Sequence, residues 1–106
     1  MSSDHRQVRI ETEDRLVAEA DLSTDPDEGV VHADLHVEAG HQPPGARTEL
    51  VDAVLDQVND ASVRRVQATV PAGDAEMLQR LRERCHDVET RPAGSTVLVD
   101  GELTDQ

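Results

Sequence analysis

The segment from Val30 to Val58 constrains the fold most, because a strand, a turn and a helix follow one another in it directly. The strand reads VVHADLHVEA, the turn contains Gly45, and the helix carries the apolar stripe of TELVDAVLDQV. In such a unit, the free backbone N–H groups and the positive dipole end of the helix point into the turn. This arrangement is typical of an anion site, usually one for phosphate.

Three strand patterns define the first half of the chain. Apolar and polar residues alternate along Gln7–Thr12, Arg15–Leu22 and Val30–Ala39, as in strands that are buried on one face. Glu13-Asp14 and Asp25–Gly29 suit the turns between them. The three strands therefore predict an antiparallel meander with one apolar and one solvated face. The expected inward positions of the second strand are Leu16, Ala18, Ala20 and Leu22.

The second half of the chain predicts two helices and three more strands. The first helix has the apolar stripe Leu50, Val51, Val54, Leu55 and Val58, at helical spacing. Arg65–Val70 alternates as a strand, and Asp74 is placed to cap a second helix that extends to Cys85. Asp87–Arg91 and Thr96–Leu103 then read as two strands around a turn with glycine. The expected core stripe of the second helix is Leu78, Leu81 and Cys85.

These elements predict one α/β (α+β) domain over residues 1–106, with the order βββ-α-β-α-ββ and with frayed ends at 1–5 and 104–106. The two helices follow the third and fourth strands, so these strands should pair in parallel through right-handed crossovers. The sheet would be mixed and mostly antiparallel. Both helices would cover its apolar face and leave the charged face of the first three strands uncovered.

Composition narrows the class of partner. The formal net charge of −13 argues against a nucleic-acid partner, which needs a basic surface. No apolar run approaches the ~20 residues of a membrane span, and the N-terminus lacks signal-peptide character, so we expect a cytoplasmic protein. A single cysteine, Cys85, suits that reducing compartment. The chain has no Phe, Tyr or Trp, which predicts a thin core or a partner that adds buried area, such as a second copy.

The element order and the turn together resemble the acyl-CoA-binding half of the GNAT N-acetyltransferase superfamily. In that family a strand ends in V-x-P, and a [QR]-x-x-G-x-[GA] loop opens a helix with paired aliphatic residues. Val37-Glu38-Ala39 falls at the first motif, Gln42–Arg47 at the second and Leu50-Val51 at the aliphatic pair. The resemblance covers about Val8–Leu103 and lacks the family's N-terminal strand and two helices.

The resemblance implies a transferase that moves an acetyl group from acetyl-CoA, or another acyl-CoA, to an amine of a small molecule or a protein. The strand end at Leu35 and Val37 would hydrogen-bond the pantetheine arm, and the helix start would hold the pyrophosphate. Glu38, near the acceptor position, is the candidate general base. The implied cofactor-binding residues are Leu35, Val37, Gln42, Gly45, Ala46, Arg47, Thr48 and Asp74.

Several positions depart from the family pattern. Pro43 and Pro44 have no N–H to offer a phosphate, and Arg47 stands where the family has Gly or Ala. Leu81 stands where a family Tyr protonates the leaving thiolate. Two functions therefore stay open: an acetyltransferase that lacks this acid, or a non-catalytic GNAT-derived interaction or regulatory module, homodimeric through the uncovered face.

Other polar residues have structural alternatives to a chemical role. His32, Asp34, His36 and Glu38 share one strand face, where they form either a metal site or simply a solvated surface. Cys85 is expected to be a buried structural thiol. The arginines of the second helix (Arg80, Arg82 and Arg84) are expected to pair with Glu76 and Glu83. His86 is expected to mark the end of that helix.

Overall fold

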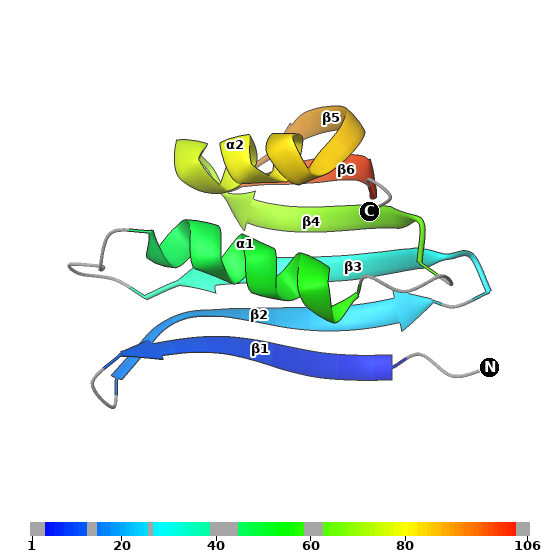
Figure 1. The fold of residues 1–106 in the computed structure, drawn as a ribbon. Coiled ribbons are helices and arrows are strands. Elements are labelled where there is room, and N and C mark those ends of the chain that lie inside the picture. The colour runs from blue at the N-terminus through cyan, green and yellow to red at the C-terminus, as the bar shows by residue number, and fades with distance from the viewer. Residues whose placement is uncertain (1–3, 13–14, 26, 39–44, 59–62, 104–106) are drawn as a thin grey trace.

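A single six-stranded sheet carries both helices on one face (Figure 1). The structure is a computed structural model that describes residues 4–12, 15–25, 27–38, 45–58 and 63–103. Its elements are β1 (Asp4–Thr12), β2 (Arg15–Asp25), β3 (Val30–Val37), α1 (Ala46–Gln57), β4 (Arg65–Pro71), α2 (Ala75–Arg84), β5 (Cys85–Ala93) and β6 (Thr96–Leu103). The expected order βββ-α-β-α-ββ is confirmed.

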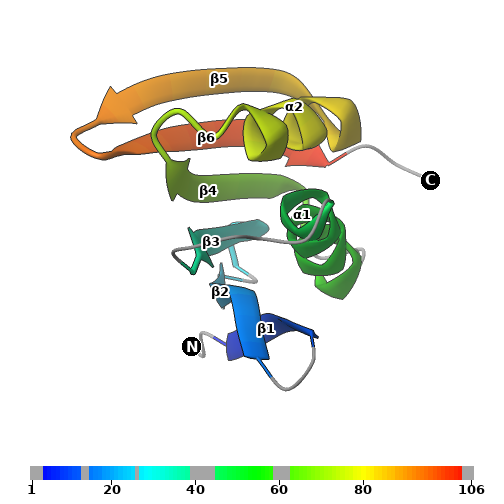
Figure 2. The same ribbon diagram turned by 90° about the vertical axis from the view of Figure 1, so that its left-hand side faces the viewer.

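The strands lie in the spatial order β1-β2-β3-β4-β6-β5. β3 and β4 are parallel, and every other neighbouring pair is antiparallel. The sheet is therefore mixed and mostly antiparallel, as predicted. In Figure 2, β2 and β3 are seen nearly end-on while β5 and β6 run across the view, which shows the strong twist that L-residues give to strands.

One apolar core lies between the helices and the sheet. The predicted stripe of α1 is buried in full, from Leu50 to Val58, and it packs on β1, β2 and β3. α2 packs on β5, β6 and α1, with Met77 and Leu81 buried. The sheet contributes alternating small aliphatic residues such as Ala18, Ala33 and Val66. Short side chains bring the layers together without any aromatic residue.

The first two strands differ from their predictions in two places. β1 includes Asp4 and His5, whereas we expected these residues to belong to a frayed end. Between Ile10 and Glu11 of β1 the pairing register with β2 shifts, and Val17 is buried there while Leu16 is only half-buried. This irregularity interrupts the two-residue alternation on which the inward position of Leu16 was predicted.

The end of the second helix also differs from its prediction. α2 ends at Arg84, and the buried Cys85 is the first residue of β5, so its thiol joins the core from a strand. Burial raises the pKa of this thiol, which keeps it protonated at neutral pH. Met77 is fully buried in α2, whereas Leu78 is only partly buried. The helical spacing of Leu78, Leu81 and Cys85 predicts a stripe that starts one residue after the observed one, so it does not include Met77.

Asp52 of α1 joins the two helices by ion pairs. It accepts hydrogen bonds from Arg80 Nε at 2.7 Å and from Arg84 Nη1 at 2.8 Å, while Arg84 also contacts Asp56 and Arg80 contacts Glu83. The hydrogen bond from Arg80 is the largest cause of a lowered pKa at Asp52, with Arg84 adding to it. The predicted ion pair between Arg80 and Glu83 is confirmed. Glu76 was also expected to pair with an arginine of α2, but it contacts Thr48 of α1.

We expect Asp52→Asn to lower the free energy of unfolding at pH 7 by about 1 kcal/mol, since charged hydrogen bonds contribute about 1.5–3 kcal/mol and solvent screens this partly exposed pair. Because folding lowers the pKa of Asp52, its contribution is present above about pH 4 and is lost as the pH falls through the folded pKa. Urea unfolding from pH 7 to pH 2.5 should show the wild-type and variant curves converging. Asp56→Asn, whose side chain is 70% exposed, is the control with little effect.

Candidate functional site

The parallel strands β3 and β4 part at one end of the sheet. Their pairing runs from Val30 and Arg65 to Asp34 and Thr69, although β3 continues to Val37 and β4 to Pro71. Beyond Asp34 and Thr69, β3 stays paired with β2, and β4 stays paired with β6. In the described part of the chain, Leu35–Val37 and Val70–Pro71 therefore have no β3–β4 ladder partners, and we call this unpaired stretch the opening between β3 and β4.

The first turn of α1 lies at this same end of the sheet (Figure 1). Gly45 precedes the helix with φ +82°, a left-handed conformation that glycine adopts without steric cost. Among the described residues, chain neighbours aside, a Cβ at Gly45 would meet no atom within 4 Å. Ala46 is buried beneath it. The resemblance places a pyrophosphate at this helix start, where Arg47 and Thr48 are half-buried.

An internal carboxylate already contacts this helix start. Glu76, from the first turn of α2, accepts a hydrogen bond from Thr48 N at 3.0 Å and another from Thr48 Oγ1 at 2.9 Å, both at Oε2. A free N–H and the dipole of a helix N-terminus attract anions. The α1 start thus binds an anion in this structure, and that anion belongs to the chain itself.

An ion pair adds a second link between the same two helix starts. Arg47 Nε donates to Asp74 Oδ2 at 2.9 Å, and Asp74 Oδ1 accepts from Met77 N at 3.2 Å as the predicted N-cap of α2. The Asp74 side chain is only 7% exposed, because the Arg47 side chain and the α2 backbone enclose it. Arg47 therefore reaches the N-cap of α2, and its guanidinium is engaged by a carboxylate.

The remaining predicted residues divide into three groups. Leu35 is buried, and Val37 is partly buried at the parted end of β3. Glu38 follows directly, with a side chain that is 41% exposed and an Oε2 that lies 3.4 Å from His36 Nε2. Gln42 lies outside the described residues. The structure thus brings together Leu35 and Val37 on one side of the opening, and Gly45–Thr48 with Asp74 on the other.

The sheet face opposite the helices contains a hollow of about 510 Å³. It extends from His5 of β1 to Arg91 of β5 and reaches Asp34 and Thr69, where β3 and β4 begin to part. Leu98, 42% exposed, lies in it. The strand patterns predicted an uncovered charged face here, but not its concave shape, which follows from the twist of the sheet. The acidic side chains in the hollow are Asp21, Asp34, Glu89 and Asp100.

The His-rich face of β3 does not form the alternative metal site among the described residues. His32, Asp34 and His36 are exposed and spaced along one strand, and the ligand atoms that come together lie elsewhere, on β5 and β6. His32 and Asp34 lie in the hollow described above.

Comparison with solved structures identifies the fold. The chain superposes on the GNAT domain of S. lividans PAT with a TM-score of 0.68 and 13% identity, covering 94% of this chain and 61% of that one. For a GNAT-family acetyltransferase from Streptococcus pneumoniae the TM-score is 0.67 and the identity 13%, and the match covers 95% of this chain and 67% of that one. A third match is N-acetylglutamate synthase from Neisseria gonorrhoeae, whose structure is complexed with coenzyme A and N-acetyl-glutamate. Its TM-score is 0.67 and its identity 15%, and the match covers 93% of this chain and 26% of that one.

The chain has the GNAT fold. It spans about three fifths to two thirds of the length of the first two of these structures. No protein-family model matches the sequence, and no curated protein matches it. None of the helices in the described part of the chain combines the length and apolarity needed to cross a membrane.

Proposed function

We propose that the chain binds an acyl-CoA, with acetyl-CoA as its first candidate, in the opening between the ends of β3 and β4. The observation that carries this proposal is the loss of β3–β4 pairing after Asp34 and Thr69, directly beside a helix start that attracts an anion. Unpaired strand backbone suits the amide groups of a pantetheine arm. The GNAT fold of the chain supports the same position for the cofactor.

The residues proposed to hold the cofactor divide between the two sides of the opening. Leu35 and Val37 would offer backbone groups to the arm, and Gly45–Thr48, after a turn in which Gln42 is a further candidate, would face the pyrophosphate. Glu76 would have to turn away from Thr48, since its carboxylate occupies the donors that a phosphate would use. Arg47 Nε already donates to Asp74 Oδ2, so a phosphate would compete with Asp74 for this guanidinium.

We further propose that an amine, of a small molecule or a protein, accepts the acyl group from the side of the hollow. Bound acetyl-CoA would supply the activated acyl group for this transfer. Asp21 and Asp34 would attract the amine as a cation, and Glu38 is the proposed base that removes its proton before attack. Because the chain contains no tyrosine, we propose that solvent protonates the thiolate that leaves.

Calorimetric titration with acetyl-CoA tests the binding proposal. We expect binding by the wild-type protein, a loss of at least tenfold for Gly45→Leu, and little change for Gly94→Leu. Both glycines have positive φ, +82° and +69°, and among the described residues, chain neighbours aside, a Cβ added at either one would meet no atom within 4 Å. The two variants therefore carry a similar backbone cost, but only Gly45→Leu places a side chain beside the α1 start. Wild-type protein without binding at millimolar acetyl-CoA would contradict the proposal.

A second candidate function is a non-catalytic interaction module. The hollow of about 510 Å³ with the exposed Leu98 favours it, and the chain lacks the tyrosine that the resemblance assigns to catalysis. Release of free CoA thiol in the presence of a panel of amines separates the two candidates. Binding of acetyl-CoA without thiol release would favour the module, and sedimentation would then show whether a second copy of the chain covers the hollow.

A further inference from the structure

The start of β5 contains an irregularity that groups three metal-binding side chains. His86 pairs with Glu102 of β6, and Glu89 pairs with Asp100. Two residues of β5 therefore lie opposite the single Gly101 of β6, which is the geometry of a β-bulge. Asp87 lies in the bulge with φ +54°. Among the described residues other than glycine, it is the one with a positive φ.

This bulge changes the direction of the Asp87 side chain. In a regular strand, neighbouring residues point to opposite faces, so Asp87 would point away from His86. The observed order is Cys85 buried, His86 and Asp87 exposed, and Val88 partly buried. Val88 packs inward over Gly101, where a Cβ would lie 3.2 Å from Val88 Cγ2. The extra residue thus puts His86 and Asp87 on the same face.

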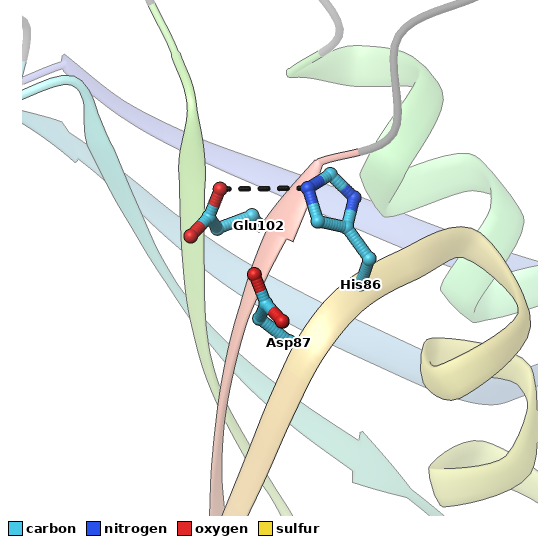
Figure 3. Close-up of side chains that lie close together, drawn as sticks. All are labelled: His86, Asp87 and Glu102. Atoms are coloured by element: carbon cyan, nitrogen blue, oxygen red, sulfur yellow. Dashed lines mark ion pairs between the residues drawn. The ribbon is translucent and has the colours of Figure 1, made fainter.

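The three side chains converge closely enough to share an ion (Figure 3). One ligand atom each from His86, Asp87 and Glu102 lies within 4.8 Å of the other two, and His86 Nε2 lies 3.4 Å from Glu102 Oε1. Ligand atoms at bond lengths of about 2.1 Å are about 3.4 Å apart in a tetrahedral zinc site. The limit of 4.8 Å on the three observed spacings is about 1.4 Å above this value, so an ion would have to draw the side chains together.

The donor set indicates the class of ion. One imidazole and two carboxylates form a mixed N and O set of the kind that binds Zn²⁺ and related divalent transition metals. Two carboxylates balance the charge of such an ion, and the exposure of all three side chains leaves room for water ligands. The neighbouring cation Arg65 is engaged by Asp100, which limits its repulsion of an ion bound beside Glu102.

We propose that His86, Asp87 and Glu102 bind one divalent transition-metal ion, with Zn²⁺ as the probe, and that the ion fastens the start of β5 to the end of β6. This site is separate from the opening between β3 and β4, so the proposal does not depend on acyl-CoA binding.

Zn²⁺ titration of chelator-treated protein, followed by calorimetry, tests the site. We expect His86→Ala to lose at least tenfold in affinity. His36→Ala is the matched control, because His36 and Glu38 also lie 3.4 Å apart but have no third ligand atom within the described residues. It should bind Zn²⁺ as the wild type does. Wild-type protein without binding at millimolar Zn²⁺, or equal losses in both variants, would overturn the proposal.

Asp87→Gly separates metal binding from folding. Glycine accepts φ +54° more readily than aspartate, so the metal-free variant should melt at the same temperature as the wild type or higher. We expect its Zn²⁺ affinity to fall at least tenfold all the same, and the rise in melting temperature on adding Zn²⁺ to disappear. A variant that keeps the wild-type Zn²⁺ shift would show that Asp87 is not a ligand and would overturn the three-residue site.

Discussion

Glu76→Gln is expected to raise the affinity for acetyl-CoA about tenfold, which corresponds to about 1.4 kcal/mol. The Glu76 carboxylate occupies Thr48 N and Thr48 Oγ1, and it would repel a pyrophosphate at the same place. Two like charges about 4 Å apart repel by about 1 kcal/mol in water and about 4 kcal/mol near a protein surface. The neutral amide removes this repulsion and is a weaker competitor for the two donors.

Glu83→Gln is the matched control for this substitution. It removes one negative charge from the same helix, and Glu83 is half-exposed and contacts Arg80. Calorimetric titration of both variants with acetyl-CoA should therefore show tighter binding for Glu76→Gln alone. Equal affinities of the two variants would mean that the Glu76 carboxylate does not compete with the cofactor. The phosphates would then bind at a place other than the α1 start.

Leu50→Ala is expected to lower the free energy of unfolding by about 3 kcal/mol. The side chain is fully buried between α1 and the sheet, and large-to-small substitutions of buried leucines cost about 2–5 kcal/mol. A domain of this size has about 5–15 kcal/mol in total, so one substitution removes a large part of the stability. The core contains no aromatic residue that could move into the cavity.

Leu98→Ala provides the comparison, since it makes the same chemical change at a side chain that is 42% exposed. Its free energy of unfolding should stay within about 0.5 kcal/mol of the wild-type value. Urea unfolding of the two variants at pH 7 measures both. A loss below about 1 kcal/mol for Leu50→Ala would contradict a single core between the helices and the sheet.

Regular periodicity made most of the fold predictable. The stripe of α1, the strand Arg65–Val70 and the cap at Asp74 each follow from local rules of burial or hydrogen bonding, and each is confirmed. The parallel β3–β4 pair followed from the helix between those strands. The sheet faces of Val17 and Asp87 could not be predicted in the same way. Each lies at a shift of the pairing register, and such a shift changes the face on which a residue lies without leaving a clear signal in the local sequence.

The candidate site was less predictable than the fold. Motif register placed Gly45–Thr48 at a helix start, but no local pattern indicates that Glu76, 28 residues from Thr48, contacts it. That contact depends on how α1 and α2 pack. The cluster of His86, Asp87 and Glu102 has the same origin, since it needs both the β5–β6 register and the bulge. In both places, contacts between elements that are distant in the sequence bring the residues together, and a local sequence pattern does not indicate such contacts.

The most direct test of acyl-CoA binding is a titration of ¹⁵N-labelled protein with acetyl-CoA, followed by the backbone amide signals. We expect saturable shifts at Leu35–Val37 and at Gly45–Thr48, on the two sides of the opening, with little change at the β5–β6 turn around Gly94. No shifts at millimolar acetyl-CoA, or shifts that avoid both strand end and helix start, would contradict binding in the opening between β3 and β4.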